Sequence, residues 1–130
     1  MNSPVRADDE RPPRRVLIVD DEFDIAATYS MLFEFHGFAV TTAANGEEAL
    51  AAAGAGAPDI IVSDYMMPTM NGAQLCVRLR ADPATRAIPF ILMSAGVLAE
   101  TAIPYDAFMR KPVHFELLLR KVESLLAPRG

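Results

Sequence analysis

Five polar side chains stand where short apolar runs of this sequence end, and their residue types suit the joint binding of a cation and an anion. Taken singly, each has an ordinary explanation, because Asp is favoured at helix N-caps and a lysine is usually a solvated surface charge. Independent caps and surface charges would not all follow apolar runs. The common position of the five residues after such runs therefore predicts a single site. These residues are Asp20, Asp21, Asp64, Ser94 and Lys111.

The adjacent pair Asp20 and Asp21 raises the question of how two like charges are tolerated side by side. Two close carboxylates raise the pKa of one of them unless a divalent cation supplies the missing charge. Oxygen ligands without a nearby histidine or thiol favour Mg²⁺, or Mn²⁺ in its place, and Mg²⁺ often binds carboxylates together with a phosphate oxygen. Lys111 and the Ser94 hydroxyl could hold other phosphate oxygens. The remaining carboxylate would then be a nucleophile that forms an aspartyl phosphate.

Apolar runs and helical spacings predict the elements that would bring these residues together. The runs typical of strands span residues 16–19, 38–42, 59–65, 88–95 and 107–109. Helical patterns follow the first run up to Gly37, then occupy residues 45–56, 71–81 and a last segment through Leu118 to Leu125. This alternation predicts an α/β fold, with a five-stranded, essentially parallel sheet and helices on both faces. In such a sheet the ligand lies at the carboxyl ends of the strands, where the five side chains are expected to meet.

Length, composition and charge limit the classes of protein. The 130 residues fit one domain. Although 52% of them are apolar, no apolar run approaches the roughly 20 residues of a membrane span. The first residues contain no apolar segment of a secretory signal, and Cys76 is the sole cysteine, so we expect a cytoplasmic protein without disulfides. The net charge of -5 argues against direct binding to nucleic acid.

The two ends of the chain are expected to lie outside the folded domain. Residues 1–14 are polar and contain two prolines, so we expect a disordered tail there. Residues 128–130 are expected to form a short second tail, which leaves residues 15–127 for the folded domain. Nothing after Leu126 resembles an output domain.

Four short motifs, in this order and spacing, resemble the receiver domain of two-component response regulators. The motifs are VDDE at residues 19–22, SDYMMPTMNG at 63–72, MSA at 93–95 and FMRKP at 108–112. The resemblance extends from about residue 16 to residue 126 and implies a stand-alone receiver with strand order 2-1-3-4-5. It also implies a phosphoacceptor and not an enzyme, which promotes only its own phosphotransfer and slow autodephosphorylation.

The resemblance gives roles to the acidic residues and implies partners. Asp64 would be the phosphoacceptor and would bind the metal ion together with Asp21 and the backbone carbonyl of Met66. Asp20 would act mainly through a metal-bound water. The donor would be a sensor histidine kinase or a histidine phosphotransfer protein that docks beside the first helix. The downstream partner would be an unidentified protein, with no direct role for nucleic acid or membrane.

Other implied roles concern the phosphoryl group and the response to it. Lys111, Ser94 and the backbone of Ala95 would contact phosphoryl oxygens. Ser94 would move towards the group after transfer, and the ring of Phe108 would follow it inward. The peptide bond between Lys111 and Pro112 would be cis, which lets Lys111 point back into the site.

The stretch between Ser94 and Lys111 is shorter than the resemblance implies. It must supply a switch loop, a fourth helix, the exit from that helix and the fifth strand. Pro104 cannot lie inside a helix, so a helix has room only from about Val97 to Ala102, which is under two turns. We therefore expect a short, mobile or non-helical segment, and we expect phosphorylation to order it as a protein-binding loop.

Three other interpretations stay open at this point. A phosphatase of the haloacid dehalogenase type also uses an aspartyl nucleophile with Mg²⁺, but it has a second acid two residues later, where this chain has Met66. A flavodoxin-like electron carrier would need a hydroxyl- and amide-rich phosphate loop after the first strand, where this chain has DDEFD. A degenerate receiver would only bind protein partners, and retention of all five site residues argues against it.

Overall fold

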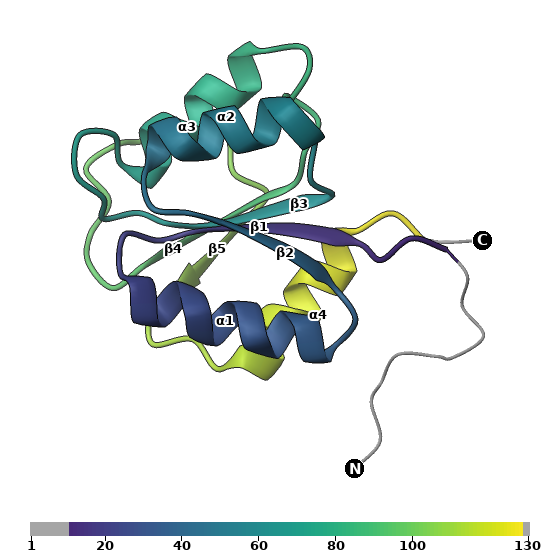
Figure 1. Cartoon of the computed structure of the whole chain (residues 1–130). Coiled ribbons are helices and arrows are strands. Elements are labelled where there is room, and N and C mark those ends of the chain that lie inside the picture. The colour runs from purple at the N-terminus through teal and green to yellow at the C-terminus, as the bar shows by residue number, and fades with distance from the viewer. Residues whose placement is uncertain (1–10, 129–130) are drawn as a thin grey trace.

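The computed structural model describes residues 11–128, which form a five-stranded parallel sheet between two layers of helices (Figure 1). The strand order is β2-β1-β3-β4-β5, as predicted. The strands are β1 (Arg15–Val19), β2 (Ala39–Ala43), β3 (Ile60–Asp64), β4 (Phe90–Ser94) and β5 (Ala107–Arg110). The helices are α1 (Phe23–Phe35), α2 (Gly46–Gly56), α3 (Gly72–Ala81) and α4 (Phe115–Leu125).

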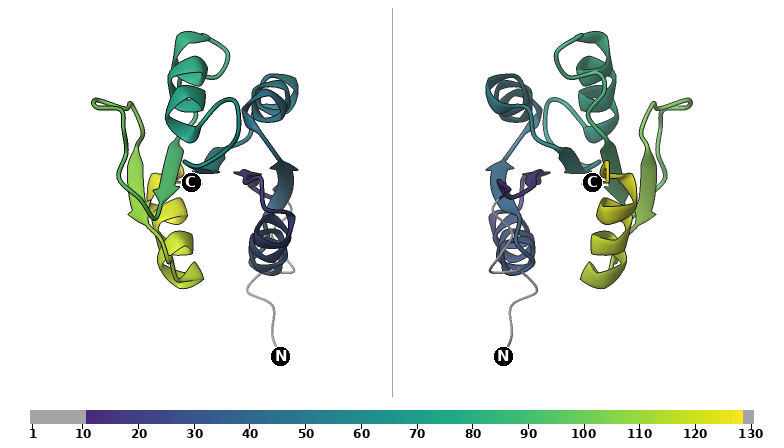
Figure 2. Two further views of the ribbon diagram at one scale, coloured as in Figure 1. Left: turned by 90° about the vertical axis from the view of Figure 1, so that its left-hand side faces the viewer. Right: turned by 90° about the vertical axis from the view of Figure 1, so that its right-hand side faces the viewer.

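Strands β1, β3 and β4 form the buried centre of the sheet, because most of their residues are apolar. Side chains alternate between the faces. Leu17 and Val19 pack on the side of α2 and α3, whereas Val16 and Ile18 pack on the side of α1 and α4. Figure 2 shows these two helix layers on opposite sides of the sheet. Burial on both faces explains why the strands are continuous apolar runs in the sequence.

The helices begin and end at residues with the expected backbone roles. Gly37 follows α1 with a φ of 89°, the left-handed conformation that glycine adopts without a steric penalty. The side chain of Asn45 accepts the N–H of Glu48 at 2.9 Å and caps α2. The side chain of Asn71 accepts the N–H of Gln74 at 2.9 Å and caps α3. Both caps fix the first turn of a helix that follows a strand.

The predicted start of one strand differs from the structure, and parts of the two predicted tails lie outside the described residues. Strand β2 begins one residue later than predicted, because Phe38 lies in the turn after α1 and donates its N–H to the carbonyl of Phe33 at 3.1 Å, which closes the end of the helix. Of the predicted N-terminal tail, residues 1–10 lie outside the described residues, and residues 11–14 contain neither helix nor strand. Residues 129 and 130 of the predicted C-terminal tail also lie outside. Within residues 11–128, no helix is long and apolar enough to cross a membrane.

The connection between β4 and β5, residues 95–106, contains no helix. The fourth helix, predicted to be short or irregular, is thus replaced by bends and irregular backbone. Arg80 ties the far end of this connection to the sheet. Its guanidinium donates to the carbonyls of Pro104 and Ile88, at 3.1 and 2.7 Å, and pairs with Asp106 at 2.6 Å. The connection therefore has a fixed end although it has no regular secondary structure.

All four described helices begin along one edge of the sheet. Each helix follows a strand, and all strands are parallel. The carboxyl ends of the strands and the first turns of the helices therefore lie along a common rim, which is where the functional side chains are expected.

Candidate functional site

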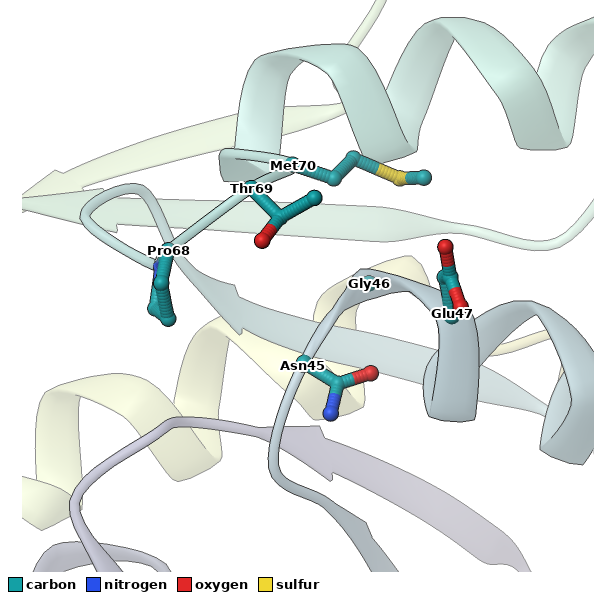
Figure 3. A pocket seen from close by; sticks show the side chains of 6 residues that line it. All are labelled: Asn45, Gly46, Glu47, Pro68, Thr69 and Met70. Atoms are coloured by element: carbon teal, nitrogen blue, oxygen red, sulfur yellow. The ribbon is translucent and has the colours of Figure 1, made fainter.

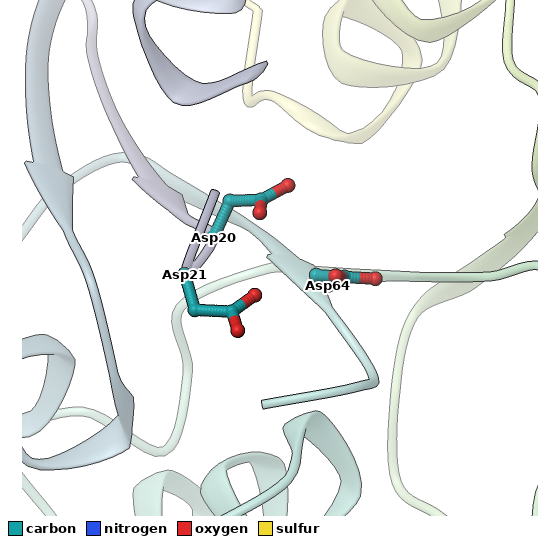
Figure 4. A group of neighbouring side chains, drawn as sticks. All are labelled: Asp20, Asp21 and Asp64. Carbon is teal, nitrogen blue, oxygen red and sulfur yellow. The ribbon is translucent and has the colours of Figure 1, made fainter. Parts of the chain in front are cut away.

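Three carboxylates meet on the rim, at the ends of β1 and β3 (Figure 4). Oxygen atoms of Asp20, Asp21 and Asp64 all lie within 4.8 Å of one another. Val19 pairs with Ser63 in the ladder between β1 and β3, which brings the residues that follow them side by side. Asp20 and Asp64 are only 2% and 4% exposed, whereas Asp21 faces solvent. This group could hold a metal ion.

The surroundings of Asp20 fit a cation. Its Oδ1 accepts the N–H of Glu22 at 2.9 Å, but its Oδ2 is buried and has no hydrogen-bond partner among the described residues. Burial raises the pKa of Asp20, and the hydrogen bond from Glu22 lowers it. The negative charge of Asp64 raises the pKa again, and the net shift is upward. A divalent ion would provide the positive charge that this carboxylate lacks.

Lys111 faces the same carboxylates from beyond the end of β5. Its Nζ lies 3.0 Å from Oδ1 of Asp64, and its backbone N–H donates to the carbonyl of Ser94 at 3.0 Å. Burial lowers the pKa of Lys111, but the bond to Asp64 and the negative charge of Asp20 raise it, and the net shift is upward. The ammonium group therefore stays charged beside Asp64 at neutral pH. The peptide bond that follows it, to Pro112, is cis.

The other predicted residues, Ser94, Ala95 and Phe108, lie around this centre. Ser94 is buried, and its hydroxyl accepts the N–H of Gly96 at 3.2 Å and donates to the Gly96 carbonyl at 3.3 Å. Ala95 is exposed, and its carbonyl accepts a bond from Arg110 at 3.3 Å. Phe108 packs on the core between the sheet and helices α2 and α3, with the guanidinium of Arg110 5.6 Å from its ring centroid. The Ser94 hydroxyl is thus bonded to its own loop.

Met66 is two residues beyond Asp64, and its side chain is 67% exposed. A thioether is not a ligand that Mg²⁺ prefers, so only the backbone carbonyl of Met66 suits the predicted metal-binding role. The exposed thioether also occupies the position where a phosphatase of the haloacid dehalogenase type has its second acid, which argues against that alternative.

A separate pocket of about 200 Å³ lies between the start of α2 and the loop from β3 to α3 (Figure 3). Glu47 is the one ionisable side chain among its lining residues. The pocket therefore offers no paired groups for acid–base or metal chemistry. Its lining residues are Asn45, Gly46, Glu47, Pro68, Thr69 and Met70.

Comparison with known families agrees with this geometry. The family described as response regulator receiver domain matches residues 16–123, which is most of the chain. The chain belongs to this family. The three carboxylates and Lys111 therefore lie on the rim of a receiver domain, the domain that two-component response regulators share.

This receiver domain is similar to parts of longer curated proteins. It is 34% identical over 121 residues to the transcriptional regulatory protein PrrA of Mycobacterium tuberculosis, which covers 89% of this chain and 51% of PrrA. It is 36% identical over 117 residues to the response regulator PleD of Caulobacter vibrioides, which covers 85% of this chain and 26% of PleD. The chain thus spans about half or less of the length of these relatives.

Solved structures of similar size have the same fold as this receiver domain. The chemotaxis protein CheY4 of Vibrio cholerae superposes with a TM-score of 0.81 at 30% identity, covering 88% of this chain and 99% of that one. The receiver domain of the Francisella response regulator 1452 gives a TM-score of 0.77 at 32% identity, covering 86% and 95%.

Sequence reasoning missed three residues of this receiver domain that connect the site to the β4–β5 connection. The hydroxyl of Tyr65 and the side-chain amide of Asn71 both donate to the carboxylate of Glu100. Tyr65 and Asn71 lie inside the quoted motif around Asp64, but no spacing or periodicity links them to Glu100. Only the path of the connection brings the three together.

Proposed function

We propose that Asp64 accepts a phosphoryl group from a phosphorylated histidine of a sensor kinase or a histidine phosphotransfer protein. The observation that carries this proposal is the position of the Asp64 carboxylate between the Lys111 ammonium group, 3.0 Å away, and the acidic pair Asp20 and Asp21. A carboxylate so placed is a nucleophile, Lys111 balances part of the charge of an incoming phosphoryl group, and the acidic pair could hold a cation that balances more of it.

The acidic residues would hold Mg²⁺, or Mn²⁺, together with the backbone carbonyl of Met66. Asp21 and Asp64 would bind the ion directly, and Asp20 would act mainly through a metal-bound water. The ion would supply positive charge that lowers the repulsion between these carboxylates and the anionic phosphoryl group. The buried and unpaired Oδ2 of Asp20 supports this assignment.

The transfer needs no further redox or acid–base partner on this chain. An Asp64 oxygen forms a bond to phosphorus while the bond from phosphorus to the histidine nitrogen breaks, and the nitrogen keeps the electron pair and takes up a proton from solvent. Lys111, the Ser94 hydroxyl and the backbone N–H of Ala95 would hold the transferred oxygens. Water would later attack the phosphorus of the phosphorylated Asp64 slowly and restore the carboxylate.

Phosphorylation would change a surface that binds another protein. Ser94 would move towards the phosphoryl group and Phe108 would turn inward, which alters the surface around the β4–β5 connection. We propose a protein as the downstream partner, because the net charge of -5 disfavours direct contact with nucleic acid. We place the reaction in the cytoplasm.

Labelling with acetyl phosphate tests the proposal. In the presence of Mg²⁺, intact-mass spectrometry should find one added phosphoryl group, and peptide mapping should place it on Asp64. The group should be absent from Asp64→Asn and from samples with excess chelator, and present in the control Asp24→Asn, which changes an exposed acid of α1. Labelling elsewhere, or equal labelling in chelator, would contradict the proposal. Sustained turnover of a phosphoester would support the phosphatase, and no labelling would support a degenerate receiver.

A further inference from the structure

One carboxylate fastens the β4–β5 connection to the segment that follows Asp64. Oε1 of Glu100 accepts the Tyr65 hydroxyl at 2.5 Å, and its Oε2 accepts the side-chain amide of Asn71 at 2.8 Å. The Tyr65 oxygen in turn accepts the N–H of Ala99 at 3.2 Å. Both oxygens of Glu100 are thus engaged, and the connection is held in its middle as well as at its end.

The two residues that hold Glu100 are themselves fixed. Tyr65 directly follows Asp64, is 6% exposed, and donates its backbone N–H to the carbonyl of Met93 at 2.8 Å. Asn71 caps α3 with the oxygen of the same amide group that binds Glu100. Glu100 therefore attaches the connection to the sheet on one side and to a helix cap on the other.

The first residues of the connection are held in a different way. The Ser94 hydroxyl exchanges two hydrogen bonds with the backbone of Gly96, and the guanidinium of Arg110 donates to the Ala95 and Gly96 carbonyls at 3.3 and 3.4 Å. The hydroxyl must leave Gly96 before it can reach a phosphoryl group on Asp64. Gly96 is only four residues from Glu100, so the proposed movement of the Ser94 hydroxyl takes place close to the bonds of Glu100.

We infer that Glu100 is a latch that favours the unphosphorylated arrangement of the connection and releases when Asp64 is phosphorylated. The inference rests on the proposed function, because it requires a phosphoryl group on Asp64. Release of the connection on phosphorylation is the opposite of the ordering that was expected from the sequence. The sequence suggested a loop that phosphorylation orders, whereas these bonds hold the loop beforehand and are lost afterwards.

Release would also reshape a groove on the α3 side of the molecule. The groove has a volume of about 580 Å³, and residues 100–103 form one wall of it while α3 forms another. Val77 of α3 is 53% exposed in this groove. The latch thus links the state of Asp64 to the shape of an exposed and partly apolar surface.

Beryllofluoride binding tests the latch, because this anion with Mg²⁺ mimics a phosphoryl group on a carboxylate. Calorimetry should give a beryllofluoride affinity roughly 5-fold or more higher for Glu100→Gln than for the wild type, which is the low end of typical coupling between two sites. The same variant should unfold at a lower temperature, since it loses native hydrogen bonds. Affinity and stability therefore shift in opposite directions, whereas a merely structural role would weaken both.

Two further variants sharpen the comparison. Tyr65→Phe should raise the affinity in the same way, and the double variant should gain little over either single variant, because both changes break one linked set of bonds. Glu47→Gln, which changes another acid lining the same groove, should bind beryllofluoride as the wild type does. Hydrogen exchange of residues 96–103 should be faster in the wild type with beryllofluoride than without it.

The outcomes separate the latch from the function on which it rests. A wild type that binds no beryllofluoride overturns the proposed function, and the latch with it. A wild type that binds, with equal or weaker binding by Glu100→Gln, overturns the latch alone. Slower exchange of residues 96–103 on binding would also overturn it.

Discussion

Gly72 lies directly against the backbone of Asp64. A Cβ atom at position 72 would come within 2.4 Å of the Asp64 carbonyl oxygen and 2.6 Å of a methyl carbon of Leu92. The N–H of Gly72 donates to the carbonyl of Tyr65 at 2.9 Å. The first turn of α3 is thus pressed onto the end of β3, and this contact fixes the loop that carries Met66.

Replacing this glycine should destabilise the protein. We expect Gly72→Ala to lower the free energy of unfolding by about 1–3 kcal/mol, because the added methyl group meets backbone that cannot move aside. Gly54→Ala is the matched control, since it lies in α2 with no side chain and no neighbouring element within 4 Å of its Cβ position, and it should raise stability by about 0.5–1 kcal/mol. Urea unfolding measures both, and equal effects would contradict the packing argument.

Asp20 should be a source of instability when no metal is bound. The folded state raises its pKa, so the folded protein holds this proton more tightly than the unfolded chain does. Stability of the metal-free wild type should therefore fall as pH rises from the ordinary Asp range through the raised pKa. At neutral pH in chelator, Asp20→Asn should be more stable by on the order of 1 kcal/mol.

Chemical unfolding at several pH values with chelator checks this prediction. Asp20→Asn should flatten the pH dependence, and Mg²⁺ should stabilise it less than it stabilises the wild type. Asp24→Asn changes an exposed acid and should keep the wild-type profile. A metal-free Asp20→Asn that is less stable than the wild type would show that this carboxylate is satisfied without a cation.

Lys111→Gln should separate phosphoryl transfer from metal binding. Loss of the ammonium group beside Asp64 should slow labelling by acetyl phosphate at least about 10-fold, because the developing charge loses a fixed positive partner. Mg²⁺ affinity should stay the same or increase, since a competing positive charge is gone. Quenched time courses of labelling measure the rate, and calorimetry measures the Mg²⁺ affinity. Lys121→Gln, an exposed change in α4, should alter neither, and a loss of Mg²⁺ binding in Lys111→Gln would contradict the assignment.

The thiol of Cys76 should react only when the protein unfolds. It is fully buried, and burial raises its pKa to about 11. Alkylation by iodoacetamide at pH 8 should be at least about 100-fold slower in native buffer than in urea, because exposure requires opening of the core. Stability should also fall as pH rises from 9 towards 11, since the unfolded thiol ionises first. Rapid alkylation in native buffer would contradict the burial.

The sheet and the acidic site could be predicted from sequence because both follow from repeated local patterns. A strand buried on both faces is a continuous apolar run, so β1, β3 and β4 are visible without any tertiary information. The parallel topology then places the residues after these runs on one edge, which is why Asp20 and Asp64 were expected to meet. The start of β2 was less predictable, because Phe38 packs in the core although its N–H still closes α1.

The contacts of the β4–β5 connection could not be predicted in the same way. Pro104 and the short length indicate that a long helix is absent, but they do not determine where the chain runs instead. The pairing of Glu100 with Tyr65, and that of Arg80 with Asp106, join residues far apart in the sequence. Single polar residues in an irregular segment have no periodicity, so their partners become known only with the path of the backbone.

The common starting edge of the four helices has an electrostatic consequence. The N-terminus of a helix carries a partial positive charge of roughly half an elementary charge, which acts within the first turn. Helix α1 begins at Phe23, just beyond the acidic pair, and α3 begins at Gly72 against the backbone of Asp64. The peptide dipoles thus attract an anion to the rim independently of any side chain. This attraction should survive in Lys111→Gln, so the labelling that remains in that variant should decrease as ionic strength is raised.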